Sequence, residues 1–235
     1  MDQQKTSNLA SKKVILFDLD GTLVDTMQIY ADVAAKLISS RYGMDIVRAR
    51  ALYLATSGLP FVRQIDMIVG LNAKNSQTVS MFEREKLEAT ETVRIRDNDK
   101  NALKSLSKKG YSLGITSNNL QENVNKFVSE EGMQNIFCRW LGWNDPGRVN
   151  KWLGLQKPSS KGEVHMSDFE RVLKVPRSEM LFIGDSLKDA EIAEHEGVDF
   201  VPKTGTFSKE DFIAKFSGRH EHFVSDIAEL NNLLP

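Results

Sequence analysis

Cysteine is nearly absent from this sequence. Cys138 is the only one, so no internal disulfide can form and no cysteine spacing indicates a metal site. Long apolar runs are also missing, because no stretch of about 18 apolar residues occurs. The first segment, MDQQKTSNLASKK, is polar and lacks the apolar stretch of a secretory signal. We therefore expect a cytoplasmic protein that has no membrane partner.

The sequence also lacks an excess of charge of either sign. Its 31 Lys and Arg residues nearly cancel its 32 Asp and Glu residues, which leaves a formal net charge of −1. Nucleic-acid binders usually carry a basic patch, and no long block of one sign occurs here, so nucleic acid is not an expected partner. The 235 residues, 40% of them hydrophobic, suffice for a buried core, and we expect a folded monomer or homodimer.

Short apolar runs rich in Val, Ile and Phe alternate with longer segments of helical period. This alternation is typical of an α/β fold with a mostly parallel sheet. Three of the helical segments end at Gly110, Gly132 and Gly197, as expected for the left-handed residue that follows a helix. The predicted strands are KVILF (13–17), YSLGI (111–115), NIFCRWLG (135–142), MLFI (180–183), VDFV (198–201) and HFV (222–224).

One long stretch interrupts this alternation. Residues 27–96 contain helical patterns and no convincing strand, which predicts a second, all-helical domain inserted after the first strand. The α/β core then comprises residues 12–26 and 97–235, and residues 1–11 form a disordered tail. Open α/β sheets bind ligands at the carboxyl ends of their strands, so we expect the insertion to lie over that edge.

Two acidic motifs directly follow predicted strands. Asp18 and Asp20 lie in Asp-Leu-Asp-Gly-Thr after the first strand, and Asp185 and Asp189 lie in Gly-Asp-Ser-Leu-Lys-Asp after MLFI. Side chains alternate along a strand, so two carboxylates two residues apart can both turn toward one site as the chain bends at Gly21. Close carboxylates repel each other unless a cation or a shared proton intervenes. Such oxygen ligands suit Mg²⁺, which takes one or two carboxylates and keeps waters and substrate phosphate.

Polar groups between the acidic motifs suit a phosphate group. The YSLGI run ends at Thr116, Ser117 and Asn118, which offer hydroxyl and backbone donors near a helix N-terminus. Lys157 precedes a proline in a loop ahead of a predicted helix, and its ammonium could screen phosphate from a carboxylate nucleophile. The four histidines show no ligand spacing, and we expect them to be surface or structural residues.

The order of these motifs carries a family resemblance. Asp-x-Asp-Gly-Thr, a strand-terminal Thr-Ser, Lys-Pro and Gly-Asp-Ser-x-x-Asp, with a helical insertion after the first motif, resemble the haloacid dehalogenase (HAD) superfamily. The resemblance implies a doubly wound, Rossmann-like core with a small all-helical cap domain. It also implies a Mg²⁺-dependent phosphomonoester hydrolase that acts on a small phosphorylated metabolite through an aspartyl-phosphate intermediate.

The same resemblance implies roles for individual residues. Asp18 would be the nucleophile and Asp20 the general acid and base, while Thr116 would bind the phosphate and Lys157 would hold phosphate and nucleophile. The implied metal ligands are Asp18, Asp20, Asp185 and Asp189. Beside Thr116, we expect Ser117 and Asn118 to contact the substrate in the core.

Substrate selection is expected from the cap, because the core motifs handle only phosphate and metal. The break Ser57-Gly58-Leu59-Pro60 resembles the substrate loop of capped relatives and is followed by Arg63. A guanidinium at that place can meet a carboxylate or a second phosphate of the substrate.

The segment 139–156 is longer than most relatives need and contains Trp140, Trp143 and Trp152. These tryptophans can line a binding mouth or bury the longer loop against the core. Lys157 lies between two other lysines, Lys151 and Lys161. Lys157 is the better match to the lysine of the family motif, because a proline follows it.

Two other functions remain alternatives. Sugar phosphomutases of the superfamily typically carry a histidine ten residues beyond the second acid of the first motif, where this chain has Tyr30. The fold could also serve as a non-catalytic binding or regulatory module. The intact set of acids argues against that role, because a binding module needs no acid aimed at a leaving group.

Overall fold

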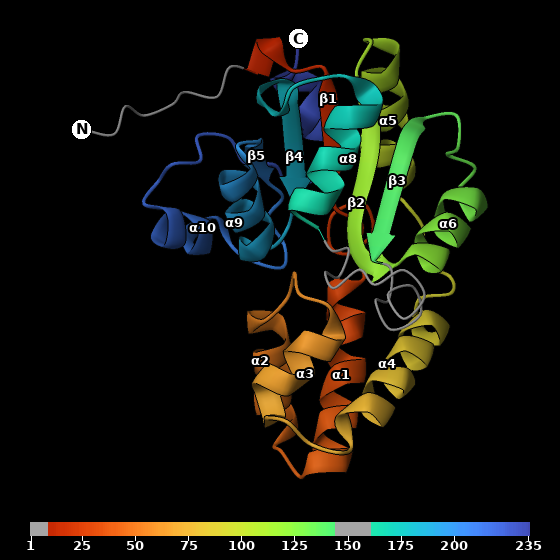
Figure 1. Cartoon of the computed structure of the whole chain (residues 1–235), viewed down its shortest axis with the longest axis vertical. Helices are drawn as coiled ribbons and strands as arrows, with labels where there is room; N and C mark the ends of the chain where they lie inside the picture. Colours follow the sequence, from red (N-terminus) through yellow and green to blue (C-terminus); the bar gives the residue numbers. More distant parts are fainter. Residues whose placement is uncertain (1–8, 144–160) are drawn as a thin grey trace. The chain divides into compact units, whose positions relative to one another are not determined.

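A computed structural model describes residues 9–143 and 161–235 (Figure 1). The chain divides into two compact units. One comprises Met1–Leu23 and Ile95–Pro235 and contains the sheet, and the other, Val24–Arg94, is helical. Both divisions fall within three residues of the boundaries that the sequence suggested, at 26/27 and 96/97.

The sheet unit is built on five parallel strands in the order β3-β2-β1-β4-β5. The first strand in the sequence is therefore the central one, and it pairs with both β2 and β4. This arrangement confirms the predicted α/β fold with a parallel sheet, and it brings the carboxyl ends of β1, β2 and β4 side by side. The strands are β1 (Val14–Phe17), β2 (Ser112–Leu120), β3 (Phe137–Trp143), β4 (Met180–Gly184) and β5 (Asp199–Pro202).

Strand β1 is buried on both faces, since all four of its residues are 0% exposed. Val14 and Leu16 pack in a core cluster that contains Phe169 of α8 and Phe212 of α10. The alternate residues of β1 point to the opposite face of the sheet. An unbroken apolar run is what a central parallel strand needs when helices cover both faces. The helices of this unit are α5 (Asp97–Lys108), α6 (Gln121–Glu130), α8 (Glu163–Leu173), α9 (Leu187–Glu196), α10 (Lys209–Phe216) and α11 (Leu230–Leu233), with short 3-10 turns η1 (Leu9–Ser11), η2 (Arg177–Glu179) and η3 (Ile227–Glu229).

The helical unit has a hydrophobic core of its own. Its helices are α1 (Met27–Tyr42), α2 (Ile46–Ala55), α3 (Phe61–Val69) and α4 (Asn75–Ala89). Aromatic rings from α1, α2, α3 and α4 meet in that core, where Phe61 and Phe82 stack with ring centroids 3.9 Å apart. An independent core is what allows an inserted segment to form a separate domain.

Three local details differ from the sequence interpretation. The strand predicted at 222–224 is wrong, because within the described ranges Val224 forms only an isolated bridge with Lys203. Strand β2 continues to Leu120, with an irregular register after Thr116. Residues 9–11, which were assigned to the tail, form η1 with Leu9 8% exposed, and residues 1–8 lie outside the described residues.

Candidate active site

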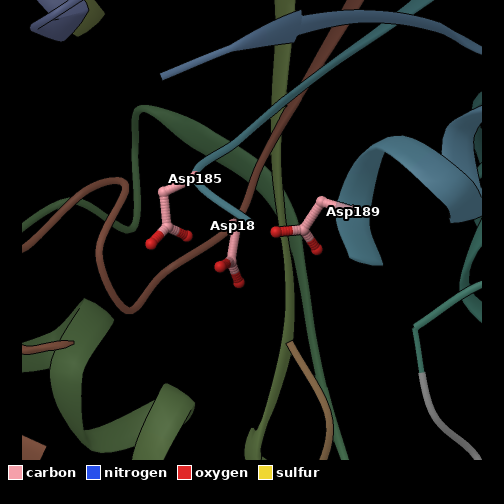
Figure 2. Close-up of side chains that lie close together, drawn as sticks. All are labelled: Asp18, Asp185 and Asp189. Atoms are coloured by element: carbon pink, nitrogen blue, oxygen red, sulfur yellow. The ribbon is translucent and has the colours of Figure 1, made fainter. Parts of the chain in front are cut away.

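Three carboxylates lie close together where β1 and β4 end (Figure 2). Asp18 directly follows β1, Asp185 directly follows β4, and Asp189 lies in the first turn of α9. One carboxylate oxygen of each lies within 4.8 Å of the others, and the residues are only 5%, 2% and 0% exposed, respectively. The parallel sheet thus joins two motifs that are far apart in the sequence into one buried acidic site.

Asp189 is held in place by the start of α9. Its backbone N–H donates to the Ser186 hydroxyl at 3.1 Å, while its Oδ2 accepts from the Ser186 N–H at 3.2 Å and from the Ser186 hydroxyl at 2.6 Å. This reciprocal capping box fixes the helix end and the carboxylate together. A Cβ atom at Gly184 would lie 2.7 Å from Asp189 Cβ and 2.8 Å from its Oδ2, so the close approach requires glycine.

Lys161 supplies a positive charge to this cluster. Its Nζ lies 2.6 Å from Asp18 Oδ1 and 2.8 Å from Asp189 Oδ1, and its side chain is 2% exposed. Its backbone N–H donates to Asn118 Oδ1 at 3.2 Å, which ties the start of this segment to β2. Burial alone would lower the pKa of Lys161, but the charges of Asp18 and Asp189 raise it above its ordinary value. Lys161 therefore stays positively charged at neutral pH.

Lys161, together with Lys203 near Asp185, only partly offsets the charge of the three carboxylates. Burial raises the pKa of Asp18 well above its ordinary value, and the charges of Asp189 and Asp185 add to the effect while Lys161 opposes it. Burial and the Asp189 charge also raise the pKa of Asp185, to about 6. Grouping buried carboxylates penalises their charged forms. A further proton or a bound cation would therefore stabilise the cluster.

Asp185 is oriented by two hydroxyl groups. Thr22 Oγ1 donates to Asp185 Oδ1 at 3.3 Å, and the Thr206 hydroxyl donates to the other oxygen. Lys203, which follows β5, donates from Nζ to the Gly21 carbonyl at 2.9 Å. Gly21 has φ of 86°, a left-handed conformation that suits glycine in the turn after the first motif. These contacts fix the first motif against β4 and β5.

Strand β2 lines the site with polar groups. Ile115 pairs with Phe17, so Thr116 and Asp18 are the next residues along neighbouring strands. Thr116 is fully buried, and its Oγ1 lies 2.8 Å from Nδ1 of His165.

Asn119, further along β2, contacts the second acid of the first motif. Its Nδ2 donates to Asp20 Oδ2 at 3.3 Å, and its backbone N–H donates to Ser117 Oγ at 3.0 Å. The side chain of Asn119 is itself 8% exposed, so it is a well-fixed donor for the half-buried Asp20.

Most of the site residues predicted from the sequence occur on the sheet unit, at the ends of β1, β2 and β4. They are Asp18, Asp20, Thr116, Ser117, Asn118, Asp185 and Asp189. Arg63 belongs instead to α3 of the helical unit, where it is exposed. Lys157 and Trp152 lie outside the described residues, whereas Trp140 and Trp143 are half-buried in β3.

Several contacting residues were not singled out from the sequence. Lys161 was noted only as a neighbour of Lys157, which the proline after it favoured and which lies outside the described residues. Asn119 directly follows the Thr-Ser-Asn segment and could have been included with it. Thr206, Lys203 and His165 belong to no motif that was used, and only the folded chain brings them to the site.

The fold and the site define an α/β protein whose central strands end in a buried acidic cluster with a lysine. The sequence profile of the haloacid dehalogenase-like hydrolases matches residues 15–202, and the chain belongs to this family. The expected relation to the HAD superfamily is thus confirmed. Within the described ranges, no helix has both the length and the apolar character needed to cross a membrane.

Several curated relatives of this chain are phosphatases. A phosphoglycolate phosphatase of Psychrobacter arcticus is 25% identical over 200 residues, which cover 80% of this chain and 81% of that protein. A phosphoglycolate phosphatase of Pseudomonas syringae is 26% identical over 196 residues, covering 79% and 67%. The crystal structure of a predicted phosphatase from Clostridium acetobutylicum superposes with a TM-score of 0.74 at 18% identity, over 94% of this chain and 97% of that one, and shows the shared fold.

Proposed function

We propose that this protein is a Mg²⁺-dependent phosphomonoester hydrolase that works through a phosphoryl group carried on Asp18. The observation that carries the proposal is the buried contact of Lys161 with Asp18 beside Asp185. A carboxylate that attacks a phosphate ester must approach an anion, so it needs nearby positive charge. The phosphatases among the relatives support the same reaction class.

The donor set fits Mg²⁺. The cluster offers carboxylate oxygens, the ligands that this ion prefers. Burial, and to a lesser extent the neighbouring carboxylates, raise the pKa values of Asp18 and Asp185, so a bound cation would stabilise their ionised forms. Asp18 and Asp185 would hold the ion, together with the backbone carbonyl of Asp20. Asp189 fits a different role, because its Oδ1 accepts from Lys161 and its Oδ2 from Ser186. When bound, Mg²⁺ would offset the charge of the phosphate and of Asp18.

The chain's own groups then divide the reaction into two steps. Asp18 forms a bond to phosphorus as the ester P–O bond breaks, and Asp20 gives its proton to the departing alkoxide. Water next attacks the phosphorus and gives a proton to Asp20, and the bond to Asp18 breaks to release inorganic phosphate. Asn119 orients Asp20 for both transfers, and Lys161 favours the ionised form of Asp18 and holds its carboxylate in place.

Thr116 and its neighbours on β2 would receive the phosphate oxygens. Thr116 is placed beside Asp18 by the pairing of β1 with β2, and its hydroxyl can donate to an anion. Asn118 would act less as a ligand than as a support, because its side chain accepts the Lys161 N–H. Lys161 takes the role that the sequence assigned to Lys157.

The substrate class that we propose is a small phosphorylated carboxylic acid. The named relatives are phosphoglycolate phosphatases, and phosphoglycolate is such a compound. We further propose that the helical unit acts as the cap that selects the substrate. Arg63 on α3 is exposed, and its guanidinium can bind a carboxylate through two parallel hydrogen bonds.

Phosphate release from a panel of esters tests this function. The panel contains phosphoglycolate, other short phosphorylated acids, sugar phosphates, nucleotides and p-nitrophenyl phosphate, each with Mg²⁺ and with a chelator. We expect Mg²⁺-dependent release that is fastest for a short acid and is lost in the Asp18→Asn variant. Normal release by Asp18→Asn would refute the nucleophile, and conversion of a sugar phosphate to an isomer without release would favour a mutase.

A further inference from the structure

His165 is a buried histidine that the proposed reaction does not use. It lies in the first turn of α8, four residues after Lys161, and is 2% exposed. Its Nδ1 is 2.8 Å from Oγ1 of the fully buried Thr116 on β2. The pair therefore links the segment that carries the lysine to the strand proposed to bind phosphate.

The contact between His165 and Thr116 is more than apolar packing, because it joins two polar groups in a buried place. Within the described residues Nε2 of His165 makes no hydrogen bond of good geometry, although the Gly142 backbone is close enough to raise the pKa of the ring. A buried polar atom without a partner is costly, and an apolar side chain would avoid that cost. The hydrogen bond to Thr116 is therefore what His165 contributes and what an apolar side chain such as leucine could not contribute at this position.

The His165 ring adds no charge to the site. Burial and the nearby Lys161 lower the pKa of His165 to about 4, so the ring is neutral at neutral pH. In a neutral imidazole one nitrogen is a donor and the other an acceptor. Because the neutral ring carries no positive charge, it can bind the Thr116 hydroxyl without attracting the Asp18 carboxylate away from Lys161.

We propose that His165 is a positioning residue that aims the Thr116 hydroxyl at a phosphate oxygen. The unprotonated oxygens of phosphate only accept hydrogen bonds, so Thr116 can give its one hydroxyl proton to such an oxygen only if His165 Nδ1 donates to Oγ1. A threonine hydroxyl rotates freely when nothing holds it, and this contact would select one orientation before the ligand arrives. The inference rests on the proposed phosphate site at Thr116.

The test compares two replacements of His165. His165→Leu removes both ring nitrogens, whereas His165→Asn keeps an amide near the position of Nδ1. Each change is also made in a Thr116→Val background, which lacks the hydroxyl that His165 would orient. The double-mutant cycle separates an effect that acts through Thr116 from a general loss of structure.

Inorganic phosphate is the probe, measured by calorimetry in the presence of Mg²⁺. We expect His165→Leu to weaken phosphate binding about tenfold and His165→Asn to restore most of that loss, since a hydrogen bond to a charged group contributes on this scale. In the Thr116→Val background we expect His165→Leu to add no further loss. The Michaelis constant for p-nitrophenyl phosphate should follow the phosphate affinity.

Three results would overturn the inference. They are unchanged or tighter phosphate binding in His165→Leu, the same loss with and without the Thr116 hydroxyl, and no phosphate binding by the wild-type protein. If His165→Leu does not fold, His165→Gln replaces it, because its longer amide reaches the position of Nε2. Phosphate binding without turnover of any ester refutes the hydrolase proposal and leaves the affinity comparison to decide the role of His165.

Discussion

Lys161 and Asp18 form a buried ion pair, with Nζ 2.6 Å from Oδ1 and side chains that are 2% and 7% exposed. The same ammonium contacts Asp189 at 2.8 Å, so the lysine is held between the proposed nucleophile and the start of α9. A buried charge pair with additional hydrogen bonds has a fixed geometry, and removing one partner leaves the others uncompensated.

The first prediction concerns which lysine serves the reaction. Lys161→Met should lower kcat by about 10²-fold or more, because it removes the charge that offsets the approach of Asp18 to phosphate. Lys157→Met is the matched control and should keep kcat within about threefold, a change of less than 1 kcal/mol. Steady-state kinetics with p-nitrophenyl phosphate, with circular dichroism to verify folding, measures both variants. Loss of activity in Lys157→Met alone would return the role to Lys157.

The second prediction separates the metal ligand from the lysine holder. Asp185→Asn should raise the Mg²⁺ concentration needed for half-maximal activity by about tenfold or more, because it weakens a direct carboxylate ligand. Asp189→Asn should instead lower kcat at saturating Mg²⁺, because Asp189 Oδ1 accepts from Lys161 at 2.8 Å. Titrating Mg²⁺ for each variant measures the two effects. Equal shifts in the Mg²⁺ requirement would show that Asp189 is also a ligand.

The acidic residues of this site were predictable from the sequence, but the lysine and the hydroxyl groups that contact them were not. Asp18 and Asp185 each directly follow an apolar run, and parallel strands must bring such positions to one edge. Lys161 precedes a helix and lies in a segment with no periodicity, so only the fold shows that it contacts Asp18. The Thr206 hydroxyl reaches Asp185 from the segment after β5, which no local pattern reveals.

The length of an apolar run decided whether a strand was predicted correctly. The central strands are continuous apolar runs because both their faces are buried, and β1 was placed within one residue of its observed start. The short run at 222–224 looks similar, but Val224 makes a single bridge to Lys203. A run of three residues carries too little periodicity to distinguish a strand from a buried loop.

The third prediction concerns the glycine before Asp185. Gly184→Ala should lower both stability and kcat, because a Cβ there would lie 2.7 Å from Asp189 Cβ and displace the carboxylate that holds Lys161. Gly114→Ala is a control of similar crowding away from the acids, since its Cβ would lie 2.6 Å from the Phe169 ring. The control should lose stability by about 1–3 kcal/mol and keep kcat per folded molecule. Urea unfolding and active-site-normalised kinetics measure the two variants, and equal loss of kcat would contradict the assigned role of Asp189.

The last prediction uses the neutral state of His165. Its pKa is about 4 in the folded protein, lowered by burial and by Lys161 from the ordinary value of 6.5 that the unfolded chain would show. Between these values the unfolded state binds more protons than the folded state, so stability falls as the pH decreases from about 6.5 toward 4. From pH 7 to pH 5 this one group should remove about 2 kcal/mol of stability.

His165→Leu cannot take up that proton, so its unfolding free energy should fall about 2 kcal/mol less than that of the wild type over the same interval. The carboxylates of the site, including Asp18 and Asp185 with their raised pKa values, are common to both proteins, so their contributions largely cancel in the comparison. Urea unfolding at pH 7 and pH 5, in buffer free of Mg²⁺ and phosphate so that ligand binding does not contribute, gives the difference. Equal pH dependence of the two proteins would mean that the folded state does not lower the pKa of His165, so that Asp168 and the Gly142 backbone, which raise this pKa, offset burial and the charge of Lys161.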